Sequence, residues 1–426
     1  MRIVKVGTKE QLMRFVRFPW KIYPKDSPWV PPLISDFAGV LSKDKNPFWM
    51  HAKSQLFLAY DDNGNINGRI AAIIDYNYIV FQDDKCGFFG FFECFDDIET
   101  AKALFSAVKT WLKEHSIDKF IGPMNPSTND ECGFLLEGFD IPPSLMMTYT
   151  PKYYLRLAEE SGLKKIKELY AYDMDIKEDS RISRLERVAA AAKKKLPTLE
   201  IKTMQKDSFE MDLKAAISIY NSAWRKNWGF VPWSDEEFAA LASRLKIFIE
   251  PRMVIIAMIS GSPVGMLIAF PDYNQVLRKL NGKLFPFGIF KFLYYKKRIN
   301  SLRLMVMGVI KEYRHKGIEV GMYEKGLKNA LKIGYKHCEL SWVLDDNIMT
   351  QRTAEMMNGK VYKKYAIYGT ELNEEVRIID SRDHIGGKCY DYWNKNKICA
   401  HNTRRLIFLI KVWQFISRFE NRGTFN

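Results

Sequence analysis

The 426-residue sequence has no apolar run as long as the roughly 18 residues that a membrane-spanning helix requires. Its first residues, MRIVKVGTKEQL, become polar too early for a secretory signal, so we expect a cytoplasmic protein. Cysteine is scarce: there are six, with no Cys-x-x-Cys pair, which argues against a disulfide framework and a zinc site. We therefore expect reduced thiols, buried or partly exposed, and no metal site.

Acidic residues are fewer than basic residues. Sixty-five Lys and Arg stand against 50 Asp and Glu, for a formal net charge of +15. This balance favours an anionic partner, whether a membrane surface, a phosphorylated ligand or nucleic acid. No recognised nucleic-acid-binding module accompanies the charge, so we do not expect nucleic acid. Apolar residues are plentiful at 47%, enough for buried cores.

The predicted strands and helices recur in the same order along the chain. Residues 1–176 and 199–372 each begin with a short strand and a helix, and each continues through a glycine-containing hairpin. Ser234 and Glu237 have the spacing of a capping box at the start of a helix. Residues 177–198 are charged and alanine-rich and are interpreted as a linker helix. The pattern predicts an α/β (α+β) fold of two related domains.

A loop in the second half suits phosphate binding. The stretch GVIKEYRHKGIEVGMY follows the predicted strand LRLMVMGVI and opens a helix. Backbone amides at a helix N-terminus attract phosphate when glycine lets the ligand come close. Gly317 supplies that access, and the basic residues Arg314, His315 and Lys316 precede it. An ordinary surface turn has the same short Arg-x-x-Gly pattern, so the loop alone leaves both interpretations open.

The order of elements around this loop resembles that of the GNAT acyltransferase superfamily. There the pattern Gln/Arg-x-x-Gly-x-Gly/Ala holds the pyrophosphate of acyl-CoA or acetyl-CoA. Arg314 and Gly317 match it, whereas Glu319 places an acid at the third specified position. The resemblance implies tandem GNAT-like domains, each a mixed, mostly antiparallel sheet flanked by helices. The donor-binding residues that it implies are Val309, Ile310, Arg314, His315, Lys316, Gly317, Ile318 and, after the next strand, Asn347.

Longer motifs narrow the resemblance to the YghO-like group, which includes the bacterial ceramide synthases. They include NWGFVPWSDEEF, ELSWVLDDN and IGPMNPSTNDECGFLLEGFD, within a likeness that covers residues 1–372. The resemblance implies an acyl-CoA-dependent N-acyltransferase that acts on a sphingoid or other lipid-like amine. Acyl-ACP is the alternative donor. The alternative function is a catalytically silent protein that binds CoA or docks on a membrane. The first-half junction FECFDDIETAKAL has no Arg or Gly, so only the second half is expected to bind CoA.

An N-acyl transfer needs a base, because the attacking amine must lose a proton. Glu339 and Ser341 lie two apart on the predicted strand CELSW and so share one face of it. We interpret Glu339 as the base and Ser341 as a group that places substrate or water. A glutamate without a catalytic role is the alternative. Where the resemblance implies a thiol-protonating tyrosine this chain has Glu355, so either Tyr362 or Tyr365 serves instead or the thiolate leaves unassisted.

Two further segments carry functional hypotheses. Asn125, Asn129 and Glu131 lie on the polar loop NPSTNDECG and either line the amine pocket or form a capped turn. The insertion KLFPFGIFKFLYYKKR, residues 283–298, mixes six aromatic residues with five cations. It is interpreted either as a segment that lies on an anionic membrane or as an internal lid.

The last residues differ in character from the rest. The segment VRIIDSRDHIGGKCYDYW, within residues 373–426, resembles a fragment of UDP-galactopyranose mutase. That resemblance implies FAD-contacting roles for Asp380, Gly386 and Gly387. The upstream Gly-x-Gly-x-x-Gly that would hold the pyrophosphate is absent, so FAD binding is not expected.

Overall fold

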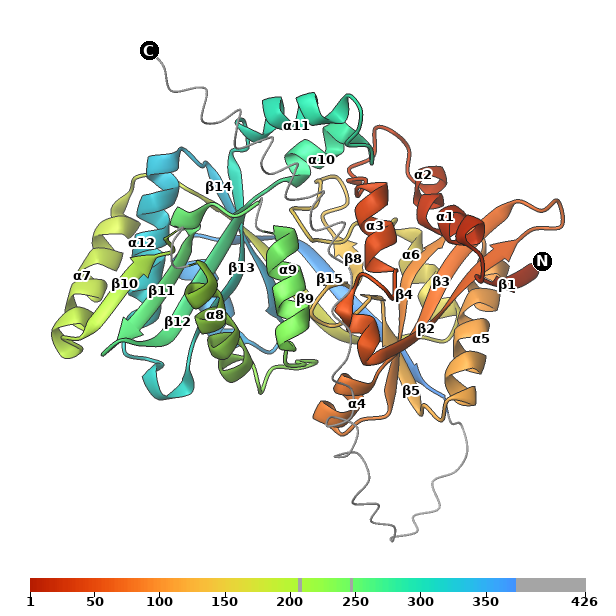
Figure 1. The fold of residues 1–426 in the computed structure, drawn as a ribbon, viewed down its shortest axis with the longest axis horizontal. Helices are drawn as coiled ribbons and strands as arrows, with labels where there is room; N and C mark the ends of the chain where they lie inside the picture. The colour runs from red at the N-terminus through yellow and green to blue at the C-terminus, as the bar shows by residue number, and fades with distance from the viewer. Residues whose placement is uncertain (206–208, 246–247, 373–426) are drawn as a thin grey trace, which may run out of the picture. The chain divides into compact units, whose positions relative to one another are not determined.

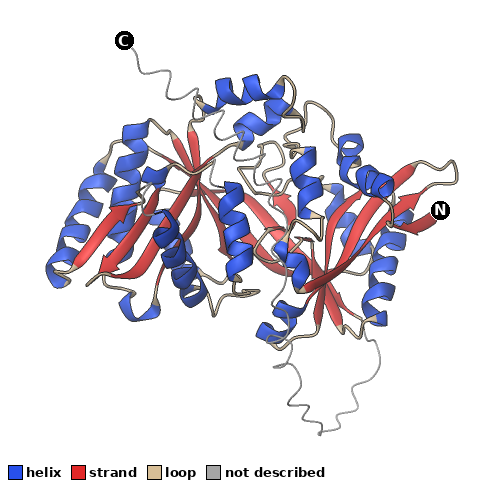
Figure 2. Ribbon diagram, in the orientation of Figure 1, coloured by secondary structure: helices blue, strands red, loops and turns tan. Residues whose placement is uncertain are grey.

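The computed structural model describes residues 1–205, 209–245 and 248–372. These residues belong to one compact unit built on a large mixed sheet that helices flank (Figures 1 and 2). The flavoenzyme-like tail of the sequence analysis, with Asp380, Gly386 and Gly387, lies outside the described residues. Among the helices that the structure describes, none combines the length and the apolar character needed to cross a membrane.

One continuous sheet runs through both halves of the chain. Its strands, in spatial order, are β1 (Arg2–Lys5), β2 (Ala52–Tyr60), β3 (Ile66–Asp75), β4 (Cys86–Cys94), β5 (Lys119–Gly122), β15 (Lys360–Glu371), β9 (Lys164–Asp175), β14 (His337–Leu344), β13 (Ser301–Val309), β12 (Ser262–Pro271), β11 (Val254–Ile259) and β10 (Leu199–Thr203). Strand β8 (Phe134–Glu137) also pairs with β15, and β6 (Met124–Asn125) pairs with β7 (Glu131–Cys132). The pairs β4–β5 and β13–β14 are parallel, and the other ladders of this sheet are antiparallel.

Helices of very different length connect the strands. The first half contains α1 (Lys9–Arg17), α2 (Pro19–Ile22), α3 (Ile34–Val40), α4 (Tyr76–Gln82), α5 (Ile98–Glu114) and α6 (Tyr153–Glu160). After α7 (Ser180–Lys195), the second half contains α8 (Phe209–Ala223), α9 (Asp235–Leu245), α10 (Asn274–Leu280), α11 (Gly288–Lys296), α12 (Ile318–Ile333) and α13 (Ile348–Met356). The predicted capping box is present: Glu237 N–H donates to Ser234 Oγ over 3.1 Å, and Ser234 N–H donates to Glu237 Oε2 over 3.0 Å.

The two halves exchange their last strands. β9 closes the first half of the chain but pairs with β14 of the second, with Asp175 opposite His337. β15 closes the second half but pairs with β5 of the first, with Tyr368 opposite Gly122. The two exchanged strands also pair with each other. The sheet therefore runs across the predicted domain limits without a break, and the limits themselves stay a prediction.

The segment predicted as a linker contains helix α7, which packs against α12 (Figure 1). The contact lies at the start of α12, where a Cβ on Gly317 would come within 3.0 Å of Ala192 Cβ. Gly317 has φ +83°, a left-handed conformation that favours glycine. The linker thus helps to shape the loop that precedes α12.

A buried ionic cluster joins the two halves. His51 Nδ1 lies 2.9 Å from Asp75 Oδ1, and its Nε2 lies 3.0 Å from Glu237 Oε1 on α9. Burial alone would lower the pKa of His51, but the bonds and charges of the two carboxylates outweigh it and raise that pKa to about 9. His51 is therefore a cation at neutral pH.

The cysteines that the structure describes are unpaired thiols. Cys86, Cys94, Cys132 and Cys338 are free and buried, as the sequence predicted for them. Burial raises the pKa of Cys338 to about 12, so this thiol stays protonated at neutral pH. The remaining two, Cys389 and Cys399, lie outside the described residues.

Candidate active site

Two parallel strands separate at the centre of the second half. β13 and β14 pair only from Ser301 with His337 to Leu304 with Leu340, although both strands continue beyond those residues. A bulge lies on each strand where the pairing stops: Met305 has no opposite residue on β12, and β14 is irregular between Leu340 and Val343. Beyond this point the facing backbone groups of the two strands are not paired with each other, which makes them available to a ligand.

The predicted catalytic residues meet at the point where these strands separate. Glu339 is only 3% exposed and faces the same side of β14 as Ser341. Ser341 Oγ–H donates to Glu339 Oε1 over 2.6 Å, and the Tyr362 hydroxyl donates to Glu339 Oε2 over 2.7 Å. Tyr362 comes from β15, 23 residues later in the sequence, and β9 lies between β15 and β14 in the sheet. Burial, and after it the charge of Glu339, raises the pKa of Tyr362 far above its ordinary value, so its phenol is protonated.

Tyr365, the alternative to Tyr362 in the sequence analysis, takes another position. Its hydroxyl is buried and makes no hydrogen bond to any described residue. Its ring packs edge-on to Trp342, with the centroids 6.0 Å apart. Tyr362 is thus the tyrosine that contacts Glu339 directly.

Arg303 supplies the positive charge beside the carboxylate. It lies opposite Glu339 in the parallel register of β13 and β14, and its Nε–H donates to Ser341 Oγ over 3.1 Å. A second guanidinium nitrogen donates to the carbonyl oxygen of Leu145 in the first half. Arg303 was not predicted from the sequence, although one signal was present: it is the only charged residue in the stretch SLRLMVM.

A first-half loop, residues 143–147, lies against Ser341 and Arg303 and is called the covering loop below. Asp272 Oδ1 accepts hydrogen bonds from the N–H groups of Leu145 and Asn274. The Asn274 side chain donates to the carbonyl groups of Pro143 and Ser144, and Met147 Sδ lies 3.4 Å from Ser341 Oγ. The candidate site is therefore assembled from both halves of the chain.

Two further buried ionisable groups surround Glu339. Burial, and after it the charge of Glu339, raises the pKa of Asp272 to about 7. Burial lowers the pKa of Lys363 to about 8, although the charge of Glu339 opposes that change. Lys363 Nζ donates to the carbonyl oxygens of Gly138 and Ile141. Such shifted groups are concentrated in functional sites, and neither residue was singled out from the sequence.

The predicted phosphate loop has the backbone that such a loop needs. After β13 a short turn, Lys311–Tyr313, leads through Arg314 to Gly317, and α12 begins at Ile318. No side chain among the described residues caps the α12 N-terminus, so its first N–H groups remain available to an acceptor. The macrodipole of this 16-residue helix adds positive potential there.

The basic side chains of the loop are arranged differently from one another. Arg314 braces the loop: its Nε–H donates to the Val309 carbonyl over 2.9 Å and its Nη2 to the Ala223 carbonyl over 2.6 Å. His315 and Lys316 are exposed, and Lys316 Nζ lies 4.9 Å from the centre of the Tyr313 ring. The positive charge at the surface of the loop thus comes from Arg314 and Lys316, both exposed, together with the helix terminus.

Glu319 folds back onto the loop. Its Oε1 lies 3.4 Å from the backbone nitrogen of His315, which donates to it. An anionic ligand on this loop would compete with the carboxylate for that amide. The sequence analysis identified the acid as a departure from the superfamily pattern, and the structure gives it a specific partner.

The remaining predicted donor residues have structural roles. Val309 is buried, Ile310 N–H donates to the Val264 carbonyl over 2.9 Å, and Ile318 is fully buried. Asn347 is the N-cap of α13, where its Oδ1 accepts from Thr350 N–H over 3.2 Å. A donor-binding role for these four residues stays a prediction.

The first-half polar loop is anchored on both sides. Asn125 Oδ1 accepts from Phe91 N–H over 2.6 Å. Asn129 crosses to the second half, where its Nδ2 donates to the Val231 carbonyl and its Oδ1 accepts from the Tyr220 hydroxyl. Glu131 lies on β7 and is half-buried. These contacts match the interpretation as a capped turn, and an amine-binding role stays a prediction.

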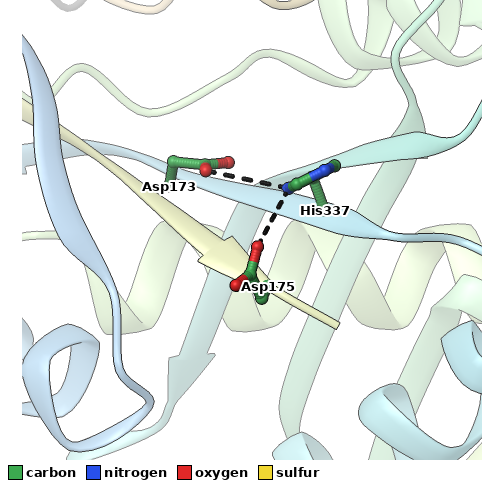
Figure 3. Close-up of side chains that lie close together, drawn as sticks. All are labelled: Asp173, Asp175 and His337. Atoms are coloured by element: carbon green, nitrogen blue, oxygen red, sulfur yellow. Dashed lines mark ion pairs between the residues drawn. The ribbon is translucent and has the colours of Figure 1, made fainter. Parts of the chain in front are cut away.

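One His and two Asp side chains lie close together on β14 and β9 (Figure 3), and one of them, Asp173, is opposite Glu339 in the register of the two strands. His337 Nδ1 is 3.3 Å from Asp175 Oδ1 and 3.8 Å from Asp173 Oδ2. In the described residues these three form the one group of three or more such side chains with metal-ligand spacing. His337 lies opposite Asp175 in the register of β14 and β9, which accounts for this proximity, and the expected absence of a metal site stays a prediction.

Two curated relatives match nearly their whole length. The chain is 33% identical over 380 residues to the bacterial ceramide synthase of Caulobacter vibrioides, which covers 87% of this chain and 98% of the relative. It is 32% identical over 371 residues to protein YghO of Escherichia coli, which covers 85% of this chain and 94% of that protein. No family model matches the sequence.

Solved structures support the same architecture. A tandem GNAT protein from the clavulanic acid biosynthesis pathway superimposes with a TM-score of 0.51 at 9% identity, covering 88% of this chain and 99% of that one. At so low an identity the match concerns the fold. The predicted tandem GNAT architecture and the predicted group of relatives are both confirmed.

Proposed function

Since the chain belongs to the family of the bacterial ceramide synthase and YghO, within the GNAT superfamily, we propose that it is an acyltransferase that moves an acyl group from acyl-CoA to an amine. The observation that carries the proposal is the position of Glu339. This buried carboxylate, with hydroxyl groups on both oxygens, lies where β13 and β14 stop pairing. A thioester inserted between the two strands would meet unpaired backbone groups on one side and Glu339 on the other.

The donor would be held mainly by the backbone. The uncapped N-terminus of α12 and the left-handed Gly317 suit a pyrophosphate, because amides and the helix dipole stabilise anions there. Lys316 would add positive charge beside the His315 side chain, and Arg314 would keep the loop in shape through Val309 and Ala223. A phosphopantetheine carried by acyl-ACP presents fewer phosphates, so a donor preference for CoA is expected from this loop.

The residues around Glu339 suit proton transfer. In the reaction the amine nitrogen forms a bond to the acyl carbon, the carbon–sulfur bond breaks, and one proton leaves the nitrogen while the thiolate gains one. Glu339 would accept the proton from nitrogen, directly or through water. Arg303, which donates to Ser341, would offset part of the negative charge around Glu339. The protonated Tyr362 phenol, which donates to that carboxylate over 2.7 Å, would return a proton toward sulfur.

The acceptor is proposed to be a lipid-like amine of the sphingoid class. Support comes from the relative named bacterial ceramide synthase, which this chain matches over 98% of its length. The covering loop adds Leu145 and Met147, two apolar side chains, next to the polar cluster. An apolar wall beside a single carboxylate suits an amine attached to a hydrocarbon chain better than a sugar or a polyamine.

A catalytically silent CoA-binding protein is the second candidate. Two departures from the superfamily pattern support it: Glu319 occupies one amide of the loop, and Glu355 stands where a thiol-protonating tyrosine is implied. The first would weaken donor binding, and the second would slow departure of the thiolate.

A thioester-consumption screen separates the two candidates. The full chain is incubated with acyl-CoA of several chain lengths, or with acyl-ACP, and with a panel of sphingoid, lipid-like and polar amines. Release of free thiol together with amide product, dependent on a long-chain amine, is the expected result. Donor binding by calorimetry without turnover with any amine would favour the silent protein. Failure to bind any acyl donor would contradict both the acyltransferase and the silent CoA-binding protein.

A further inference from the structure

The insertion between β12 and β13 has an unusually one-sided charge. Residues 274–300 contain seven Lys and Arg residues and no Asp or Glu. They fold into the helices α10 and α11, which Figure 1 shows as a helical pair lying beyond the ends of the strands of the second half. The segment contributes nearly half of the chain's formal net charge of +15.

One side of this helical pair is part of the core. Ile289 and Phe292 of α11 are buried, and Phe292 packs with Tyr273, Leu280 and Leu145. The Phe292 and Tyr273 rings are stacked, with centroids 5.8 Å apart. The pair is therefore fixed in place on the covering loop, as the lid interpretation expected.

The opposite side exposes large aromatic rings. Phe287 is 76% exposed, Phe290 69%, Tyr294 54% and Phe285 51%. Phe287, Phe290 and Tyr294 recur at helical spacing, so they point to one side. Exposed cations lie among the rings at Lys283, Lys291, Lys297 and Arg298, and the Arg298 guanidinium lies 3.9 Å from the centre of the Tyr294 ring. These eight residues form what is called the docking surface below.

We propose that the docking surface binds the surface of an anionic lipid bilayer. Aromatic side chains enter the headgroup boundary favourably, and cations beside them pair with lipid phosphates. Each cation near such a surface strengthens binding about fivefold at moderate ionic strength. A protein partner would need matching acids and a matched apolar surface, whereas an anionic bilayer supplies negative charge and an apolar interior at once.

The docking surface is directly connected to the candidate active site. Helix α10 begins at Asn274, whose side chain holds Pro143 and Ser144 of the covering loop. The next residue of that loop, Leu145, bonds to Arg303, which bonds to Ser341. Docking would bring a bilayer close to this loop, which suits a substrate that resides in the membrane. This last step rests on the proposed function, whereas the docking itself does not.

Vesicle sedimentation tests the docking without any measurement of catalysis. The full chain is mixed with vesicles of phosphatidylcholine alone and of phosphatidylcholine with phosphatidylglycerol. Binding to the anionic vesicles only, weakened by added salt, is expected. The F287S/F290S double variant should lose at least about tenfold in the partition coefficient, since two aromatic anchors are removed. The K291E/K297E variant should lose more than that.

Two matched control variants test whether vesicle binding depends on the docking surface in particular. The M50S/V80S variant removes two apolar side chains of similar exposure, 76% and 70%, from elsewhere in the chain and should bind within about twofold of the wild type. The K164E/K177E variant makes the same net charge change at two other exposed lysines and should lose far less than K291E/K297E.

Several outcomes would overturn the proposal. One is that the full chain fails to bind anionic vesicles. Another is that F287S/F290S binds as the wild type does. A third is that both charge variants lose binding equally, which would mean that net charge alone is responsible. If light scattering shows a dimer that F287S/F290S converts to a monomer, without vesicle binding, a second copy of the chain covers this surface instead.

Discussion

Glu339 shows how much a single side chain depends on its neighbours. Its carboxylate accepts two hydroxyl hydrogen bonds and lies opposite an arginine, so its charge is held in a fixed direction within a buried site. A buried carboxylate needs such partners, because an unpaired buried charge is strongly destabilising. The same partners would also serve catalysis, since they keep the proton acceptor in one position.

The first prediction at this scale concerns the base. Glu339→Gln keeps the shape of the side chain but removes its ability to accept a proton. We expect kcat to fall by about a hundredfold or more, with the Kd for acyl-CoA unchanged. Tyr362→Phe, which removes one donor to the same carboxylate, should have a smaller effect. An E339Q enzyme with undiminished kcat would show that Glu339 is structural.

The second prediction concerns the acid on the loop. Glu319→Gln removes a negative charge from the first turn of α12. The amide oxygen that replaces the carboxylate is a weaker acceptor for the His315 N–H, which leaves this N–H more available to the donor. Acyl-CoA should then bind about two- to fivefold more tightly, and the gain should shrink in high salt. Glu200→Gln, at an exposed site on β10, is the charge-matched control and should leave the Kd unchanged. Weaker binding by E319Q would mean that the carboxylate supports the loop.

At the scale of elements, helix α12 links the loop to the linker helix. Both of its ends are glycines with left-handed φ angles, +83° at Gly317 and +100° at Gly334. The surroundings of the two differ. A Cβ on Gly317 would press on Ala192, whereas a Cβ on Gly334 would meet nothing within 4 Å.

This pair of glycines provides the third prediction. Gly317→Ala and Gly334→Ala should each lower the free energy of unfolding by about 1 kcal/mol, because alanine disfavours positive φ. G317A should lower it further through the contact with α7, and it should also weaken acyl-CoA binding. Chemical denaturation and calorimetry measure the two effects. Equal donor affinity in the two variants would count against the loop as the donor site.

At the scale of the whole molecule, the two halves depend on each other. β9 and β15 each complete the part of the sheet that begins in the other half. His51, Asp75 and Glu237 add an ionic link between them, and the covering loop adds hydrogen bonds to Asp272, Asn274 and Arg303. We therefore expect one cooperative unfolding transition for residues 1–372.

The fourth prediction follows from the strand exchange. A chain that ends at residue 176 contains β9 but lacks β15, so both β5 and β9 would lose a partner strand. Expressed alone, it should be unstable or self-associate through those edges. Coexpression with residues 177–426 should restore a folded complex. A stable monomer of residues 1–176 with a cooperative melt would show that the exchange is not needed for folding.

The fifth prediction concerns pH. The folded pKa of His51, about 9, is raised above its ordinary value of 6.5, so its contribution to stability is complete below pH 6.5 and is lost as the pH rises through 9. Allowing for solvent screening, this amounts to about 1–2 kcal/mol.

Denaturant unfolding of the wild type and of His51→Gln at pH 6 and pH 9.5 measures this contribution. Asp272 and Lys363, with pKa values of about 7 and about 8, titrate in the same range, so the difference between the two proteins is the informative quantity. Glu237→Gln, which retains the capping box, should lose part of the same pH dependence. A wild-type minus H51Q difference that does not change with pH would refute the ionic link.

The α/β class, the repeat of elements and the capping box could be predicted from the sequence, because hydrophobic periodicity and capping residues act over a few neighbouring positions. The tandem GNAT architecture and the YghO-like group followed from the resemblance of longer motifs. The sequence also offered Glu339 and Ser341 as candidate site residues, with Tyr362 as one of two tyrosines, and their catalytic roles stay predictions. Two of them share a strand face at a spacing of two, which is a local relation.

What those residues contact depends on the tertiary structure. Tyr362 reaches Glu339 across β9, Arg303 reaches Ser341 across the parallel pair, and the covering loop comes from the other half of the chain. The sequence carries no local signal for the exchange of β9 and β15, because pairing between strands nearly 200 residues apart depends on the whole sheet. Burial likewise sets the pKa of Asp272 and of Lys363, and it arises only when the two halves close on each other.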